Sequence, residues 1–334
     1  MRIIESISEI SSEKFFPIFF WDKWKTVEEQ LHHKQRLLCV DEEENVIAFT
    51  LYKMRFFKKA DYLYVPLDKN GNRLKVEKEK RFLDDFHIYL KKNKIADAIF
   101  PPTHLVVFCA VPSGVMYYKI GILVTNLKQS EDSLMSKINP KVRTELRKAE
   151  KLDVKILHGK DYIKSFYDCF QGTVKQKGIS NFSLKYFNDI SQILGENAVF
   201  SIAMLNNNIE ASLFSLKDDK YFYPSYSGTS YMPQYKGSNK YLIWHIYTHL
   251  MKTGVEKFYY GGYRYDIDEK DPLNNIQKFK MRLGCDIEDG YHFIKVINPL
   301  KYNLINLAMK CKSLLTGKNY SFVNLKGLDV KKSK

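Results

Sequence analysis

One loop of the sequence combines residue types that favour an anion-binding site. Gln234, Gly237 and Asn239 stand directly before residues 240–253, which the apolar pattern predicts to be a helix. The first N–H groups of a helix have no partners within it, and the helix dipole favours negative charge there. Glycine lets an anion approach the backbone closely. The loop therefore predicts a phosphate site, with a helix capped by Ser238 or Asn239 as the plainer alternative.

A second group of candidate residues is cationic. Asn139 and Pro140 are a suitable N-cap and first residue for a helix that carries Arg143 and Arg147. Only nine of the 53 basic residues are arginine, and this helix is the densest arginine site. Arginine offers a planar fork that suits phosphate, whereas lysine is a solvated point charge. The helix predicts either an ordinary solvated face, which is commoner, or a surface that binds a polyanion such as tRNA.

These segments resemble known families. The Gln234–Asn239 loop resembles a degenerate form of the Q/R-x-x-G-x-G/A pyrophosphate loop of GNAT acyltransferases. Residues 139–156 resemble the R-x-x-x-R-K-A segment that opens the second domain of the Fem family, the peptidoglycan-bridge aminoacyltransferases. Residues 240–262, which end in FYYGG, resemble that family's L-x-W-x(n)-G-x-x-x-Y-D-F-G-G block. Residues 276–284 resemble its Y-R-F-K-x-G-F-G block, and the three blocks follow the family's order.

The resemblance implies an α/β fold of two GNAT-like domains in tandem, each a mixed central sheet flanked by helices. It implies transfer of an aminoacyl or acyl group from aminoacyl-tRNA or acyl-CoA to an amine of a nucleotide- or lipid-linked cell-wall or polysaccharide precursor. Either donor is a co-substrate, and no bound cofactor is implied. Tyr259 replaces the family's aspartate, and Arg282-Leu283-Gly284 replaces Gly-Phe-Gly. A non-catalytic relative that binds a glycan precursor or nucleic acid is therefore the alternative.

Acyl transfer to an amine needs groups that stabilise an oxyanion and accept a proton. The resemblance assigns stabilisation of the oxyanion, or of a donor phosphate, to Lys280, which follows Phe279 in the Phe-Lys pair. Arg264 is suited to a phosphate or carboxylate. Asp266 is the candidate proton acceptor, although loop carboxylates are more often simply solvated. Tyr226 and Phe279 are expected to contact substrate, and a core position is the commoner alternative for Tyr226.

Other kinds of site receive no support. The five cysteines are scattered and form no C-x-x-C pair, so we expect no metal site. His245 and His249 have the spacing of H-E-x-x-H but lack its glutamate, so we interpret them as structural. The sequence shows neither a helix-turn-helix nor a zinc finger, and we expect no sequence-specific DNA binding.

Composition limits the protein class. A chain of 334 residues predicts about two domains, and the formal charge of +15 comes mostly from diffuse lysine. No apolar run approaches the ~18 residues of a spanning helix, and the first ten residues lack the apolar core of a signal peptide. We therefore expect a cytoplasmic protein. The apolar stripe of residues 300–314 favours core packing, with peripheral contact with the inner membrane as the alternative.

The periodic patterns place these candidates on elements. We expect residues 1–137 to form the first domain, completed by residues 300–325, and residues 138–299 to form the second. Residues 326–334 are expected to be a basic tail, frayed at its end. Helices are predicted at residues 77–92, 140–151, 161–177, 183–194, 240–253 and 300–314, and strands at residues 36–40, 46–56, 62–67, 105–111, 117–127, 154–157, 198–205, 209–216, 221–227, 257–260 and 291–296.

Overall fold

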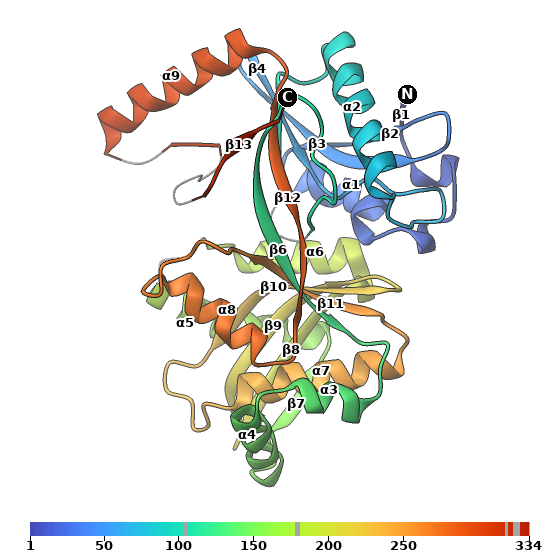
Figure 1. Cartoon of the computed structure of the whole chain (residues 1–334). Coiled ribbons are helices and arrows are strands. Elements are labelled where there is room, and N and C mark those ends of the chain that lie inside the picture. The colour runs from blue at the N-terminus through green and yellow to red at the C-terminus, as the bar shows by residue number, and fades with distance from the viewer. Residues whose placement is uncertain (103–105, 178–180, 318–319, 323–327, 334) are drawn as a thin grey trace. The chain divides into compact units, whose positions relative to one another are not determined.

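The computed structural model describes residues 1–102, 106–177, 181–317, 320–322 and 328–333, and the chain forms two compact units (Figure 1). Unit 1 comprises residues 1–122, 262–269 and 288–334, and unit 2 comprises residues 123–261 and 270–287. The expected boundary at 137/138 falls inside unit 2. Helix α3 (Glu131–Lys137) belongs there because its buried Leu134 packs beside Gly284.

Unit 1 is built on a mixed sheet. Strands β1 to β4 pair antiparallel in chain order, and β5 then adds to β4 in parallel after helix α2. Strand β12, which begins at the end of unit 2, pairs antiparallel with β5. The elements are β1 (Arg2–Ile4), α1 (Asp22–Gln30), β2 (Gln35–Val40), β3 (Val46–Met54), β4 (Phe57–Tyr62), α2 (Val76–Lys92), β5 (Ala98–Phe100), β12 (Asp286–Val296), α9 (Pro299–Thr316) and β13 (Lys331–Lys332).

Unit 2 repeats this order of elements. Strands β7 to β10 pair antiparallel in chain order, and after helix α7 strand β11 adds to β10 in parallel. The predicted α/β class, with mixed sheets in tandem, is confirmed. The remaining elements are β6 (Met116–Asn126), which begins in unit 1 and ends in unit 2, α4 (Pro140–Lys151), β7 (Lys155–His158), α5 (Ile163–Lys177), α6 (Leu184–Leu194), β8 (Ala198–Leu205), β9 (Asn208–Lys217), β10 (Tyr221–Thr229), α7 (Ser238–Lys252), β11 (Lys257–Tyr263) and α8 (Pro272–Met281).

Capping residues and a terminating glycine explain where several predicted helices begin and end. The Asn139 side chain accepts a hydrogen bond from the Lys141 N–H, with Pro140 in the first turn of α4. The Ser183 hydroxyl caps α6 in the same way. After α7, Gly254 takes the left-handed conformation, with φ of +82°, that ends many helices. The caps therefore fixed these boundaries to within a few residues.

Two predicted strands are wrong. Beyond Tyr62 only Leu67 makes a bridge, because the Leu63 and Tyr64 N–H groups both donate to the Ala48 carbonyl oxygen. In residues 105–111, Leu105 lies outside the described residues and Phe108 makes an isolated bridge to Tyr291.

A buried carboxylate explains the second of these errors. The Cys109 and Ala110 N–H groups donate to a carboxylate oxygen of Glu79, at 2.7 and 2.9 Å, instead of to a strand. Glu79 is completely buried, and this burial raises its pKa. The alternation of apolar residues therefore signalled burial at residues 105–111 without a ladder of strand hydrogen bonds.

The end of the chain also differs from the expected frayed tail. Lys331 and Lys332 form β13, which pairs antiparallel with Tyr117 and Met116 of β6. The Ser333 hydroxyl donates to the Pro112 carbonyl oxygen at 2.8 Å and accepts from the Val115 N–H at 3.0 Å. These backbone and side-chain bonds order residues 331–333 despite their charge, and residues 326, 327 and 334 of the predicted tail lie outside the described residues.

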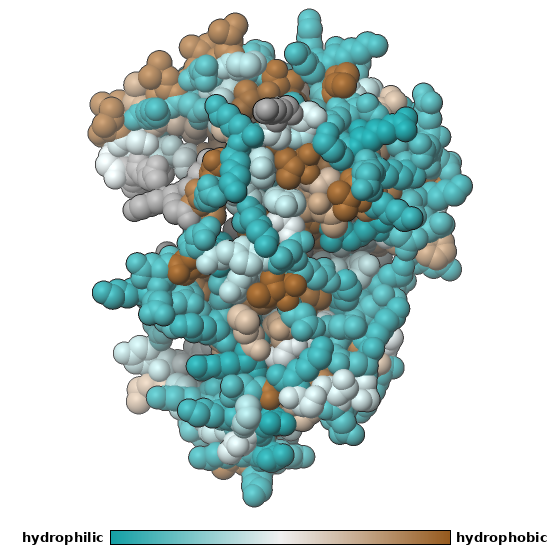
Figure 2. Space-filling view, viewed as in Figure 1, coloured by the Kyte–Doolittle hydropathy of each residue, from teal (hydrophilic) through white to brown (hydrophobic). Residues whose placement is uncertain are grey.

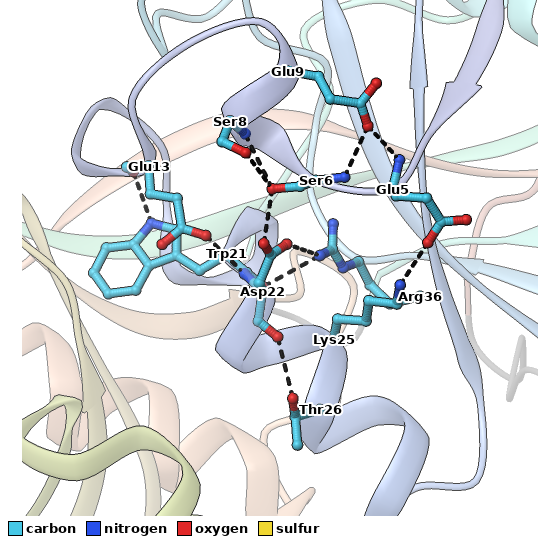
Figure 3. A network of polar contacts seen from close by, with 10 residues as sticks. All are labelled: Glu5, Ser6, Ser8, Glu9, Glu13, Trp21, Asp22, Lys25, Thr26 and Arg36. Atoms are coloured by element: carbon cyan, nitrogen blue, oxygen red, sulfur yellow. Dashed lines mark hydrogen bonds and ion pairs between the residues drawn. The ribbon is translucent and has the colours of Figure 1, made fainter.

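A buried arginine fixes the first helix to the sheet of unit 1 (Figure 3). Arg36 lies on β2 with its side chain fully buried, and its guanidinium donates to the Asp22 carboxylate at 3.0 Å. The Ser6 hydroxyl donates to the other Asp22 oxygen at 2.7 Å. The Trp21 indole N–H donates to backbone carbonyls of Glu13 and Phe16. The start of α1 is therefore held from three sides.

The core of unit 2 is aromatic. Helices α5 and α6 lie on one face of its sheet and α7 on the other (Figure 1). Phe187 of α6 is fully buried, and its ring centroid lies 5.0 Å from that of Phe166 on α5 and 5.6 Å from that of Phe214 on β9. Edge-to-face contacts of this kind add to the free energy gained from burial. Phe187 therefore joins both helices to the strands.

We expect Phe187→Ala to lower the free energy of unfolding by about 3–5 kcal/mol, because the cavity it leaves is surrounded by rigid rings. Urea unfolding followed by circular dichroism measures the change. Ile88→Ala, at a side chain 64% exposed, is the matched control and is expected to change stability by less than about 0.5 kcal/mol. Equal effects of the two substitutions would contradict this description of the core.

Candidate functional site

The two parallel strands of unit 2 separate soon after they begin. Strand β10 pairs with β11 at Tyr221↔Lys257 and Phe222↔Phe258, and within the described residues no further pair joins them. Strand β10 continues to pair with β9 as far as Thr229. An opening between parallel strands exposes backbone groups that the sheet would otherwise use, and ligands commonly bind at such carboxyl ends.

Pro224 explains where the strands separate. Proline has no N–H to give to a neighbouring strand, and it is found at edges and bulges. Between Pro224 and Tyr226 the pairing of β10 with β9 shifts register, so Ser225 forms a β-bulge. Both features fall immediately after the last pair with β11. The proline and the bulge within β10 therefore explain why this strand separates from β11.

Buried hydroxyl groups line the start of the second strand. The Tyr260 hydroxyl of β11 lies 2.5 Å from the Tyr247 hydroxyl of α7, which lies 2.9 Å from the Thr125 hydroxyl of β6. Burial raises the pKa of both tyrosines well above the ordinary value. At neutral pH these groups are therefore uncharged, and they orient one another as hydrogen-bond donors and acceptors.

Lys280 lies beside this network. Its ammonium group donates to the Tyr260 backbone carbonyl at 2.7 Å and lies 5.9 Å from the Tyr260 ring centroid. Burial lowers the pKa of Lys280, because the charged form loses water. The Cys285 thiol donates to the Lys280 carbonyl at 2.9 Å and so fixes the end of α8. An ammonium group has three donors, so Lys280 retains the capacity to bind a ligand oxygen.

The predicted anion loop is shaped by its own contacts. The Gln234 side chain accepts from the Asn206 amide at 3.0 Å, and the Gln234 and Tyr235 N–H groups donate to the Glu210 carboxylate. A Cβ atom on Gly237 would lie 2.5 Å from the Tyr235 ring. Glycine is therefore required here by the packing of Tyr235.

The start of α7 has no side-chain cap. Gly237 is the N-cap residue, and the Ser238 hydroxyl donates back to the Tyr235 carbonyl. The Asn239 side-chain oxygen is buried, and no hydrogen-bond partner is found for it among the described residues. The alternative of a cap by Ser238 or Asn239 is therefore wrong. The uncapped N-terminus keeps the character expected of an anion site.

The arginine helix packs against α7 beside this loop. Glu145 of α4 forms an ion pair with Lys240 at 2.5 Å, and its backbone carbonyl accepts from the Tyr235 hydroxyl at 2.8 Å. Arg143 is half-buried and Arg147 is exposed. The structure therefore packs α4 on α7 through Glu145, and Arg143 and Arg147 lie two residues to either side of that contact.

Tyr226 takes the commoner of its two predicted roles. Its ring lies 4.9 Å from that of Phe182 and 6.1 Å from that of Phe214, within the aromatic core around α6. Burial raises the pKa of its hydroxyl. The side chain is half-buried beside the opening, and its contact with substrate stays a prediction.

The other candidates are divided between the units. Phe279 is half-buried on α8 in unit 2. Half-buried Arg264 and exposed Asp266 belong to unit 1. In that unit burial raises the pKa of Tyr118 to about 12, and the charge of Arg264 opposes the rise. Lys280 belongs to unit 2.

The histidines of α7 stack against a third histidine ring. The His158 ring stacks against those of His245 and His249, with centroids 5.6 and 5.9 Å away. Burial, with the two neighbouring rings, lowers the pKa of His158 to about 4. Throughout the described part of the chain, no group of three or more His, Cys, Asp or Glu residues is placed to hold a metal ion.

Comparison with known proteins places the chain near one family. The FemAB family model matches residues 122–216. The crystal structure of FemX has 13% identity and a TM-score of 0.70, over 91% of this chain and 100% of that one. A Bacillus licheniformis protein described as L-PGS has 11% identity and a TM-score of 0.50, over 81% and 88%. No curated protein matches the sequence.

A third similar solved structure is that of a protein of unknown function. A conserved protein from Bacteroides thetaiotaomicron has 11% identity and a TM-score of 0.51, over 86% of this chain and 94% of that one. At such identities these structures establish the shared fold. Together with the family match, they confirm the predicted resemblance to the Fem family.

The burial of Cys285 gives a chemical test of this site. Burial raises the pKa of its thiol to about 12, which leaves a thiolate fraction of about 10⁻⁴ at pH 8. We expect iodoacetamide to alkylate exposed Cys311 much faster than Cys285 in the native chain. Peptide mass spectrometry measures both rates. Comparable rates in the folded protein would contradict the described packing around Lys280.

Proposed function

We propose that this chain is a Fem-type acyltransferase in which Lys280 stabilises the charge that develops on the donor carbonyl oxygen. The observation that carries the proposal is the partly buried Lys280 ammonium group, held on the Tyr260 carbonyl two residues after the last pair of β11 with β10. The Fem-like sequence block around Phe279 and Lys280 supports the same role, as does the fold shared with FemX.

The chemistry follows from charge development. When an acceptor amine attacks an ester or thioester carbonyl, the carbonyl oxygen becomes an oxyanion. Collapse of this intermediate forms the amide and breaks the bond to the tRNA ribose oxygen or the CoA sulfur, which leaves and takes up a proton. A cation in a site with little water stabilises that oxyanion more strongly than one in bulk water. Lys280 meets this requirement because it is largely buried and its position is fixed by two contacts of α8 and β11. The amine must also lose a proton, and exposed Asp266 stays a prediction for that step.

The donor we favour is aminoacyl-tRNA. Arg143 and Arg147 lie on α4, which packs on α7 near its uncapped N-terminus. Arginine side chains and helix N-termini both bind phosphate, and a nucleic acid presents many phosphates. Acyl-CoA is the second candidate donor, because the Gln234–Asn239 loop resembles a pyrophosphate loop. The acceptor is an amine on a nucleotide- or lipid-linked cell-wall or polysaccharide precursor.

We expect Lys280→Ala to lower kcat for aminoacyl transfer by about 10²–10³, the usual cost of removing one oxyanion donor. The assay follows the labelled aminoacyl group from charged tRNA to a nucleotide-linked muramyl peptide. Lys278→Ala, two residues away on the exposed face of α8, is the matched control and should retain activity. Circular dichroism checks that both variants fold.

The alternative function makes the opposite prediction for the same variant. If the chain is a non-catalytic relative that binds a glycan precursor or nucleic acid, Lys280→Ala leaves affinity and any turnover unchanged. A folded Lys280→Ala protein with full transfer activity would therefore remove Lys280 from the reaction.

We expect Arg143→Ala/Arg147→Ala to weaken tRNA binding and to reduce the slope of log affinity against log salt by about one to two, because two phosphate contacts are lost. Fluorescence titration at several salt concentrations measures this slope. Lys185→Ala, at a lysine paired with Asp189 on α6, is the control. If charged tRNA fails to bind at low salt, the tRNA donor is excluded.

Calorimetry with acetyl-CoA separates the second donor from the first. A chain that uses acyl-CoA should release heat on titration and should show no salt-dependent affinity for tRNA. A chain that uses aminoacyl-tRNA should be silent with acetyl-CoA.

A further inference from the structure

Helix α9 presents apolar residues on two opposite sides. On its inner side, Tyr302 and Ile305 pack against the buried cluster of Phe57, Phe100 and Ile294. This contact holds the helix to unit 1. Packing on unit 1 therefore explains only some of the apolar residues in residues 299–316.

The outer side of α9 carries large apolar residues in contact with solvent. At about 100° of rotation per residue, these side chains fall within one arc of the helix surface, so they share one face. Figure 2 shows hydrophobic residues gathered over α9. The leucines of this outer face are Leu300, Leu304, Leu307, Leu314 and Leu315, which are exposed to 79%, 56%, 60%, 86% and 87%. A solvent-exposed apolar stripe of this length usually marks a contact surface.

The charges around the outer face have one sign. Residues 299–316 contain no aspartate or glutamate, and their charged residues are Lys301, Lys310 and Lys312. At helical spacing these lysines fall beside the leucine face, and the Lys301 ammonium group forms an ion pair with the Asp97 carboxylate at 3.3 Å. Lys310 is exposed, and the Lys312 ammonium group lies 4.5 Å from the Tyr320 ring centroid. The face thus combines an apolar centre with cationic borders.

These features favour a lipid surface over a protein partner. Protein interfaces are enriched in Tyr, Trp and Arg anchors, and the outer face has none of these residues. A second copy of the chain would bring together two faces with lysine borders, in a protein of net charge +15. Anionic phospholipids supply both the apolar phase and the opposite charge. No helix among the described residues is long and apolar enough to cross a membrane.

We propose that the outer face of α9 docks this chain on an anionic phospholipid surface. Its leucines enter the boundary of the acyl chains, and Lys310 and Lys312 lie at the level of the headgroups. The helix lies along the surface, with its inner side still packed on unit 1. This proposal is independent of the acyl-transfer chemistry of unit 2.

The test is sedimentation of the full chain with vesicles of phosphatidylcholine and phosphatidylglycerol. We expect the chain to sediment with these vesicles and to bind pure phosphatidylcholine more weakly. Leu304→Glu/Leu307→Glu should lower the partition coefficient by more than about tenfold, because two apolar side chains no longer enter the lipid. Ile88→Glu, which changes an exposed apolar residue of α2, should bind as the wild type does.

Two further measurements make the result decisive. Cys311 lies on the outer face and is exposed, so an environment-sensitive fluorophore on it should shift to shorter wavelength with anionic vesicles. Light scattering of the wild type and of Leu304→Glu/Leu307→Glu reports self-association. Failure of the wild type to bind anionic vesicles overturns the proposal. Equal binding by the wild type and by the double variant also overturns it. So does a wild-type chain that does not bind vesicles but forms a dimer that the double variant does not form.

Discussion

The hydrogen bond from the Lys280 ammonium group to the Tyr260 carbonyl is the interaction on which the candidate site depends. It places a largely buried cation beside a strand that leaves its parallel neighbour after two residue pairs. A charge in such surroundings is costly unless it is hydrogen-bonded, and it interacts strongly with any new negative charge. The same desolvation that lowers the pKa of Lys280 thus makes it a suitable partner for an oxyanion.

Much of unit 2 serves to hold this arrangement. The aromatic core around Phe187 packs α6 against the sheet at Phe214 of β9. Pro224 and the neighbouring bulge then direct β10 away from β11. The hydroxyls of Tyr247 and Tyr260 join α7 to β11, and the Cys285 thiol fixes the end of α8. Except for the bond from Cys285 to Lys280, these contacts join residues of different elements, so the site forms only when the unit is folded.

Local chemistry decided some elements that the sequence analysis predicted and some that it missed. Asn139 and the terminating Gly254 marked helices correctly, whereas the caps at Ser130 and Asp271 of α3 and α8 went unused. The block around Lys280 drew attention to a residue that is partly buried and hydrogen-bonded. Long-range contacts decided the rest. Nothing local shows that Glu79 binds the Cys109 and Ala110 N–H groups, or that Tyr247 and Thr125 meet. Pro224 inside a predicted strand was a usable signal of the opening that the pattern analysis missed.

A crystal structure of the chain with a stable amide analogue of aminoacyl-adenosine, the acceptor end of charged tRNA, tests the role of Lys280 most directly. We expect the analogue's carbonyl oxygen to lie within about 3 Å of the Lys280 Nζ atom, as a hydrogen bond requires. An analogue bound with its carbonyl away from Lys280, while Nζ remains on the Tyr260 carbonyl alone, would contradict oxyanion stabilisation by this residue.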